Sequence, residues 1–97
     1  MNMRKLLKQA QEMQSKMQSE LGDTHVEAGV GGGMVTVKMD GHKHLLAVRI
    51  DPEAIDPEDP GMLEDLIVAA VNEASRKMDD TLREKLGMLA AGMPSIL

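Results

Sequence analysis

The first part of the chain carries a helical pattern of hydrophobic and polar positions. Its apolar side chains recur at spacings of three and four residues, the period of a helix that lies along another helix. These positions, which we call the apolar edge, are Met3, Leu6, Leu7, Ala10, Met13, Met17 and Leu21. No Gly, Pro or β-branched residue occurs before Gly22, and strong helix formers dominate. The pattern predicts one helix over residues 1–21.

Basic side chains gather on the other side of this predicted helix. At about 100° per residue, they fall within an arc of roughly 120°, centred almost opposite the apolar edge. We call them the basic edge, and they are Arg4, Lys5, Lys8 and Lys16. Glu12 is the one acidic residue in this arc, and Gln9 and Gln11 are neutral hydrogen-bonding side chains around it. Most charged helix faces are simply solvated, so phosphate contact is inferred here only if other observations agree.

After Gly22 the hydrophobic period changes from helical to alternating, which is typical of β-strands. Three alternating runs follow within residues 23–50. Gly31–Gly33 separates the first two runs, because glycine readily takes the positive φ of a tight turn. Asp40-Gly41 is a hairpin signal before the third run. We therefore expect a three-stranded antiparallel meander whose mostly apolar face is covered by helix.

The third run assigns its side chains to the two faces of the sheet by alternation. Four residues share one face: His44, Leu46, Val48 and Ile50. Three residues, Leu45, Ala47 and Arg49, lie on the opposite face. This alternation predicts a strand over residues 44–50.

An acidic, proline-rich connection over residues 51–61 separates the predicted sheet from a second helix. Either of its Asp-Pro pairs at 56–57 and 59–60 is a candidate helix cap, because proline is tolerated at the first helical position. A helical pattern extends over residues 62–86. The last segment, residues 87–97, contains Gly and Pro and no charge, and we expect a flexible tail.

The second predicted helix is apolar nearly all round in its first half. A helix of this kind requires burial on more than one side, against its own sheet and against something else. We expect Ile67, Val68 and Val71 to pack against a second copy of the chain. For Met13 and Met17, packing inside the subunit and packing against a second copy are both open alternatives.

The composition favours an oligomer. A chain of 97 residues forms one small domain, which buries a modest share of its surface and often needs a covalent or metal cross-link, or a partner subunit, for stability. It has no Cys, so neither disulfides nor a thiolate zinc site supplies such a cross-link. It also has no Phe, Trp or Tyr, and ten Met take much of their place. The lack of aromatic side chains argues against a protein that binds single-stranded nucleic acid by stacking on its bases.

The charge of the chain is unevenly distributed. The formal net charge is -5, which by itself argues against a nucleic-acid partner. Residues 1–19 nevertheless carry four basic residues and one acidic residue, whereas residues 51–65 carry seven acidic residues and no basic one. Screening limits the reach of exposed charges to about 8 Å at physiological salt, so a local basic patch acts independently of the mean charge.

The candidate chemical motifs are weak. The glycines of residues 29–33 lack the Lys-Ser or Lys-Thr pair and the following helix of a phosphate-binding loop. His42 and His44 have no evident third metal ligand, and the acidic connection lacks the pattern of a calcium loop. No nucleophile is paired with a base. We therefore expect no enzymatic activity, metal, cofactor or small-molecule substrate.

No apolar run is long enough to span a bilayer, so we expect a cytoplasmic protein without a membrane partner.

Four segments together resemble the YbaB/EbfC family of bacterial nucleoid-associated proteins. In order along the chain they are KQAQEMQSKM, GVGGGMVTVKMDG, VRIDPEAI and MLEDLIVAAVNEASRKM. The resemblance implies an α+β subunit of α-β-β-β-α order, forming a tweezer-like homodimer through helices and sheet edges, whose helical arms bind duplex DNA in the nucleoid. The basic arm positions of the family correspond to Arg4, Lys5 and Lys8 and, more loosely, to Arg76 and Lys77.

These observations predict a non-enzymatic, homodimeric nucleoid-associated protein that binds duplex DNA with low or shape-dependent sequence specificity. We expect a role in chromosome organisation, with gene regulation or DNA repair as further roles. The expected DNA contacts are Arg4, Lys5, Lys8, Gln9, Gln11, Lys16, Arg76, Lys77 and Arg83. The alternative is a protein–protein adaptor for proteins of DNA replication or recombinational repair, which the negative net charge and the absent aromatics keep open.

Overall fold

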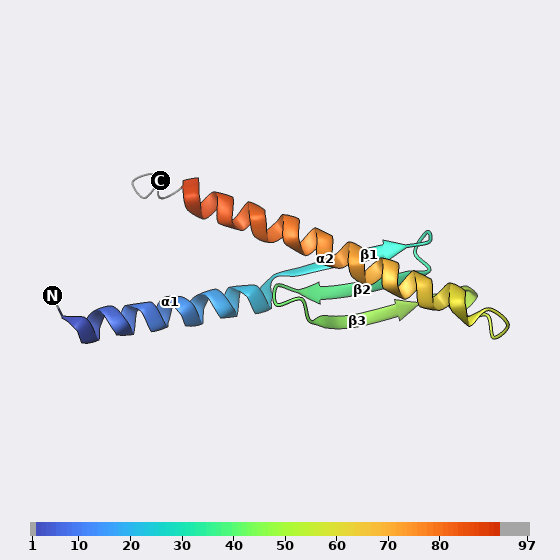
Figure 1. The fold of residues 1–97 in the computed structure, drawn as a ribbon, viewed down its shortest axis with the longest axis horizontal. Coiled ribbons are helices and arrows are strands. Elements are labelled where there is room, and N and C mark those ends of the chain that lie inside the picture. The colour runs from blue at the N-terminus through green and yellow to red at the C-terminus, as the bar shows by residue number, and fades with distance from the viewer. Residues whose placement is uncertain (1, 92–97) are drawn as a thin grey trace.

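The structure, a computed structural model, describes residues 2–91 as two helices and a three-stranded sheet (Figure 1). Helix α1 covers Met3–Asp23 and helix α2 covers Pro60–Ala91, with a short 3-10 turn at Pro52–Ala54 before α2. The antiparallel sheet has the order β1-β2-β3, formed by His25–Val30, Val35–Asp40 and Leu45–Ile50. This arrangement confirms the predicted α+β fold of α-β-β-β-α order.

Helix α1 begins and ends on capping residues. The side-chain oxygen of Asn2 accepts two hydrogen bonds from backbone N–H groups of the first turn, at 3.1 and 3.4 Å. At the other end the helix runs through Gly22 to Asp23, two residues past the predicted end, and Thr24 is its C-cap. One glycine does not end the helix, because the residues before it favour helix strongly. Met1, where the predicted helix begins, lies outside the described residues.

The two hairpin turns place their positive φ angles differently. Gly31, Gly32 and Gly33 join β1 to β2 with φ values of 64°, 69° and 92°, which confirms the expected glycine turn. In the turn from β2 to β3, the positive φ falls on Lys43 rather than on Gly41. The hairpin signal therefore marks the right place in the chain, but its glycine does not supply the turn conformation.

Gly41 lies where the end of α1 meets the sheet. Its backbone N–H donates a hydrogen bond to the Leu21 carbonyl at 2.8 Å. A Cβ atom on Gly41 would lie 2.9 Å from the Leu21 Cα, closer than Cβ atoms approach in real structures. Glycine is therefore required at this position because the backbone of α1 approaches it so closely.

A β-bulge changes the assignment of side chains to faces in β3. Lys38 pairs with Ala47, but the next pair joins Met39 to Leu45, so Leu46 is an extra residue. Leu45 therefore shares a face with the buried Met39. The predicted alternation, which placed Leu45 on the opposite face, is wrong because a bulge interrupts the period of two.

The core lies between α2 and the sheet face formed by β1 and β2. Its buried residues are Ala28, Val35, Val37, Met39, Ala70, Ala74 and Met78. The three residues from α2 recur every four positions and form the stripe that an amphipathic helix presents to a sheet. In β3, by contrast, Leu45, Leu46 and Val48 are 45%, 46% and 46% exposed. The subunit thus covers only part of its own sheet and leaves an apolar strip along β3 open.

Helix α2 is longer than the sequence pattern predicts. It begins at Pro60, and the Asp59 carboxylate accepts a hydrogen bond from its first turn at 3.3 Å, so Asp59 is the cap among the two candidates. The helix continues past Gly87 because the alanine, leucine and methionine around that glycine favour helix. Residues 87–91 of the predicted tail are therefore helical, and residues 92–97 lie outside the described part of the chain.

The subunit is long and thin, with extents of 68 × 26 × 16 Å. Its radius of gyration is 19.1 Å, whereas a compact chain of this length has about 12.5 Å. It exposes 7374 Å² of surface, roughly 1,900 Å² more than a compact monomer of the same mass. Figure 1 shows the reason, because α1 leaves one end of the sheet and extends away from it. The excess is comparable with the area that one subunit buries in a stable homodimer.

Two glycines near the end of α1 are expected to respond in opposite ways to alanine. Gly41→Ala should lower the free energy of unfolding by about 2 kcal/mol, because the Leu21 backbone has to move. Gly22→Ala should raise it by about 0.5 to 1 kcal/mol, since no atom lies within 4 Å of the added carbon and alanine favours helix. Urea unfolding measures both changes. A Gly41→Ala variant as stable as the wild type would contradict the close approach at Gly41.

Candidate nucleic-acid interface

Helix α1 is an arm that is attached by one end. None of its residues is buried, and only Leu21 and Gly22 in the last turn are half-buried. At a rise of 1.5 Å per residue, the 21 residues of the helix extend about 30 Å. Almost the whole surface of the arm is therefore open to a ligand or to another chain.

The basic edge is presented to solvent along this arm. All four of its residues are exposed, and so are Gln9 and Gln11 beside it. Within residues 2–91, no carboxylate forms an ion pair with any of these four cations. Arg4 and Lys16 mark the two ends of the basic edge, about 18 Å apart along the helix axis. The arm thus carries a row of unneutralised positive charge suited to a polyanion.

The apolar edge of the arm is uncovered as well. The exposed fractions of Met3, Leu6, Leu7, Met13 and Met17 are 67%, 44%, 60%, 67% and 53%. The subunit itself therefore does not bury Met13 and Met17, the two residues for which internal packing was one alternative. A continuous apolar stripe of this length is unusual on the surface of a soluble monomer.

The basic residues of α2 are engaged inside the subunit. The Arg76 guanidinium pairs with Glu73 and, at 3.4 Å, with Asp80, and Arg83 pairs with Asp80 at 3.3 Å. The hydrogen bond between Arg76 and Glu73 lowers the pKa of the Glu73 carboxyl and raises the pKa of Arg76. The Lys77 ammonium donates to a backbone carbonyl of β1 at 3.0 Å. These three predicted DNA contacts are thus less available than the basic edge, although exposed ion pairs exchange partners readily.

The residues expected at a dimer contact lie on two sides of α2. Val68 is 60% exposed and points away from the core. Ile67 and Val71 are half-buried and pack against the core. Of these three residues, Val68 is therefore the one whose side chain the subunit leaves open.

The base of the arm, residues 18–24, is held partly by two histidines. The His42 ring donates from Nε2 to the Gln18 carbonyl at 3.2 Å, and the His25 ring donates from Nε2 to the Gly22 carbonyl at 3.1 Å. The Gly22 carbonyl is one of the last four of the helix, which lack intrahelical partners, whereas the bond from His42 to Gln18 lies one turn earlier. His42 lies in the turn after β2, and His44 precedes β3, so the predicted strand over residues 44–50 begins one residue too early. No local pattern signals the contact of His42 with Gln18, because the two residues are 24 positions apart.

Asp40 organises the turn that carries His42. Its carboxylate accepts hydrogen bonds from the backbone N–H groups of His44 and His42, at 3.0 and 2.9 Å. The hydrogen bond from His44, followed by that from His42 and the charge of the two imidazoles when protonated, holds the pKa of Asp40 below its ordinary value of 3.8. The ionised carboxylate is therefore the form that the turn stabilises.

The lowered pKa of Asp40 predicts a change in the acid sensitivity of folding. A carboxyl group whose pKa is lower in the folded chain than in the unfolded chain stabilises the fold at pH values above its pKa in the unfolded chain. This contribution is lost as the pH falls through the pKa of the group in the folded chain. Below pH 3.8, the free energy of unfolding should therefore fall more steeply in the wild type than in Asp40→Asn. Urea unfolding in steps from about pH 5 to about pH 3 measures both slopes. Identical slopes would contradict a role for this carboxylate.

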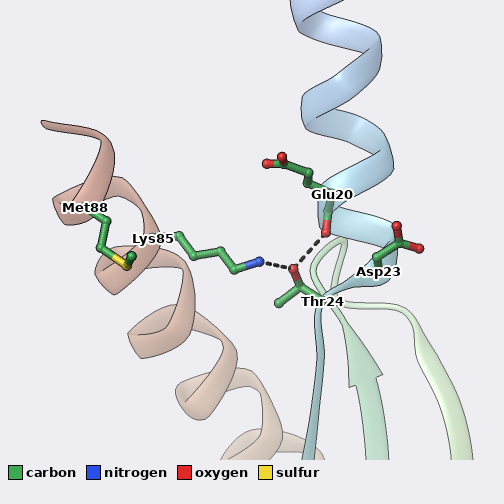
Figure 2. A pocket seen from close by; sticks show the side chains of 5 residues that line it. All are labelled: Glu20, Asp23, Thr24, Lys85 and Met88. Carbon is green, nitrogen blue, oxygen red and sulfur yellow. Dashed lines mark hydrogen bonds between the residues drawn. The ribbon is translucent and has the colours of Figure 1, made fainter. Parts of the chain in front are cut away.

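Two hollows lie between the base of the arm and the C-terminal part of α2. A groove of about 180 Å³ is lined mainly by apolar side chains, and its residues are Met17, Glu20, Leu21, Thr24, Leu82, Lys85 and Leu86. A more open hollow of about 500 Å³ is lined by Glu20, Asp23, Thr24, Lys85 and Met88 (Figure 2). In the range that the structure describes, no three His, Asp or Glu residues are grouped so that they could hold a metal ion.

The helices described for residues 2–91 include none with the length and apolar character needed to cross a membrane.

Known proteins resemble the chain over nearly its whole length. Residues 1–93 match the profile of the YbaB/EbfC DNA-binding family. A nucleoid-associated protein of Chloroflexus aurantiacus is 43% identical over 99 residues, which covers 99% of each chain. Another, from Acetivibrio thermocellus, is 46% identical over 98 residues, covering 98% of this chain and 87% of the relative. The crystal structure of an uncharacterized protein, HP0035 of Helicobacter pylori, matches with a TM-score of 0.64 and 25% identity, covering 86% of this chain and 95% of that one.

Proposed function

Because the chain belongs to the YbaB/EbfC DNA-binding family, we propose that it is a nucleoid-associated protein that binds duplex DNA as a homodimer. The observation that carries this proposal is the basic edge of α1, whose exposed cations have no ion-pair partner among residues 2–91. Duplex DNA carries one negative charge per about 1.7 Å of its axis. A row of cations about 18 Å long therefore meets several phosphates when the arm lies along the DNA backbone.

The negative net charge does not oppose this binding, because the most acidic segment, residues 51–65, is far from the arm. The acidic connection follows β3 at the end of the sheet opposite to the base of α1 (Figure 1). The subunit is 68 Å long, several times the screening length of about 8 Å at physiological salt. The acidic connection therefore does not neutralise the basic edge. It repels DNA that approaches the end of the sheet where the connection lies.

The contacts we propose are mainly electrostatic. Arg4, Lys5, Lys8 and Lys16 bind phosphates, while Gln9 and Gln11 donate hydrogen bonds to the DNA backbone or to groove edges. Phosphate contacts position a protein without reading sequence, so the specificity is low or depends on DNA shape. Arg76, Lys77 and Arg83 contribute less, because a phosphate has to displace the partners that they already hold. A protein with these contacts acts in chromosome organisation, and through it in gene regulation or DNA repair.

A second copy of the chain would cover the apolar surfaces that the subunit leaves open. Helix α2 packs on β1 and β2, whereas Leu45 and Val48 of β3 and Val68 of α2 are exposed. In a two-fold arrangement, α2 of each subunit lies on β3 of its partner, and the same patch is used twice. Met13 and Met17 extend this contact along the arms. The homodimer then presents two basic edges to one duplex.

A mobility-shift titration of the purified chain with duplex DNA over a salt series tests this function. If every cation of two basic edges neutralises one phosphate, log affinity should fall against log salt with a slope of about −7. A pull-down from nuclease-treated extract is the second measurement. Capture of proteins of DNA replication or recombinational repair, without salt-sensitive DNA binding by the pure chain, would overturn the proposal in favour of a protein–protein adaptor.

A further inference from the structure

One hydroxyl group joins the base of the arm to α2. The Lys85 ammonium donates a hydrogen bond to the Thr24 hydroxyl at 2.6 Å, and this hydroxyl donates to the Glu20 carbonyl at 2.7 Å (Figure 2). Thr24 is 7% exposed, so water has little access to its side of the contact. Across the described chain, this is the one hydrogen bond between α2 and the base of the arm.

Lys85 also brings a charge that the arm itself lacks. The C-terminal end of a helix carries a partial negative charge, which a nearby cation stabilises. The last turn of α1 contains acidic residues, Glu20 and Asp23, and no basic residue. The ammonium of Lys85 approaches this end from α2 (Figure 2). The contact therefore has an electrostatic basis as well as a geometric one.

The contact lies where a small rotation has a large effect. Because the arm extends about 30 Å, a rotation of about 10° at its base displaces its tip by roughly 5 Å. Arg4, Lys5 and Lys8 lie in the first two turns, farthest from the base. A charge-assisted hydrogen bond to a phosphate requires a distance near 2.8 Å, give or take about 0.1 Å, so such a displacement breaks it.

We propose that Thr24 and Lys85 are positioning residues for DNA binding, because their hydrogen bond fixes the angle between α1 and α2 and thereby the direction of the basic edge. The turn after β2 holds the base of the arm to the sheet through Gly41 and His42. The bond between Thr24 and Lys85 adds a restraint relative to α2. The inference rests on the proposed function, but its first consequence, the angle of the arm, is measured without DNA.

Thr24→Val tests the proposal without a change of charge. Valine has nearly the shape of threonine but cannot accept the hydrogen bond from Lys85, whereas Thr24→Ser keeps the hydroxyl and is the matched control. The chain contains no cysteine, so Ser15→Cys on the arm and Asn72→Cys on α2 can each carry a spin label. Labelled chain is mixed with an excess of unlabelled chain, so that pulsed EPR reports the distance within one subunit.

The distance distribution should broaden in Thr24→Val and stay as in the wild type in Thr24→Ser. Urea unfolding confirms that both variants fold. A distribution in Thr24→Val that superimposes on that of the wild type would overturn the proposal.

The same variants measure the consequence for DNA binding. At one salt concentration, the affinity of Thr24→Val should fall about fivefold, in proportion to the loss of the one hydrogen bond that joins the arm to α2. The slope of log affinity against log salt should not change, because the same phosphates are contacted in the complex. Thr24→Ser should retain the wild-type affinity. A broadened distance distribution with unchanged affinity would show that the arm angle does not matter for DNA, and the positioning role would be lost.

Lys85→Met removes the same bond from the other side. Its distance distribution should match that of Thr24→Val, and the double variant should be no broader than either single variant, because all three lack one shared contact. Additive broadening would contradict the proposal. A wild-type chain without DNA affinity would overturn the proposed function and the DNA-binding role of the two residues, while the distances alone would still show whether their bond fixes the arm.

Discussion

Replacement of Arg4, Lys5 and Lys8 by glutamine is expected to weaken DNA binding by at least about 100-fold near 0.1 M salt. The variant loses three of the four cations on each basic edge, and the positions lie on an exposed helix, so the fold is kept. The slope of log affinity against log salt should flatten from about −7 to about −2, since each phosphate contact contributes about 0.9. Fluorescence anisotropy over a salt series measures both quantities. An unchanged slope would remove these residues from the interface.

Lys38, Lys43 and Arg49 offer a control with the same change in net charge. Lys38 lies on β2, Arg49 lies on β3 and Lys43 lies in the turn between these strands, so none of them belongs to α1. Their replacement by glutamine also removes three positive charges from each subunit. We expect this variant to keep a slope close to that of the wild type. A similar loss in both variants would mean that overall charge, rather than contact along the basic edge, governs the affinity.

Val68→Glu is expected to dissociate the proposed homodimer. The subunit should tolerate the change, because Val68 is 60% exposed and glutamate favours helix. At the proposed contact, however, the variant would bury a charge without a partner, at a cost of about 3 to 5 kcal/mol. The dissociation constant of the dimer should rise at least about 100-fold, which sedimentation equilibrium measures. The salt slope of DNA binding should fall by about half, because a monomer has one arm.

Ile55→Glu is the matched control for this substitution. Ile55 is 55% exposed and lies in the acidic connection, so the change in charge and in exposed apolar area is similar. We expect this variant to remain dimeric. If both variants dissociate, added negative charge is the cause, and if neither does, Val68 lies outside the contact.

The features that the sequence predicted correctly are those with a local signal. The period of the apolar edge identifies α1 because every residue of that stripe lies within a few turns of the next. The glycines at 31–33 mark the first hairpin because their backbone angles are a property of the residue itself. The order of helices and strands follows from the same local patterns, and the structure confirms it.

The features that the sequence did not reveal depend on residues far apart in the chain. The need for glycine at position 41 arises from the approach of Leu21, and Lys85 reaches Thr24 across 61 residues. No window of sequence contains both partners of such a contact. The bulge at Leu46 likewise depends on the pairing with β2 rather than on the composition of β3.

The ion pairs of Arg76, which stays a predicted DNA contact, have a signal in the sequence. Glu73 and Asp80 stand three residues before it and four residues after it, the spacings at which side chains on a helix meet. Charge on a helix therefore has to be considered together with its neighbours at these spacings. By that criterion Arg4 and Lys5 have no acidic neighbour, whereas Lys8 and Lys16 each have Glu12 four residues away.

Within residues 2–91, only the base of α1 forms hydrogen bonds with the sheet and with α2, and this has an evolutionary consequence. Substitutions on the outer side of the preceding turns leave the folded body intact, because no core residue touches them. Natural selection can therefore tune the number and spacing of cations there without a penalty in folding. Lineages that differ in the salt concentration inside the cell are free to vary the arm while they inherit the same folded body.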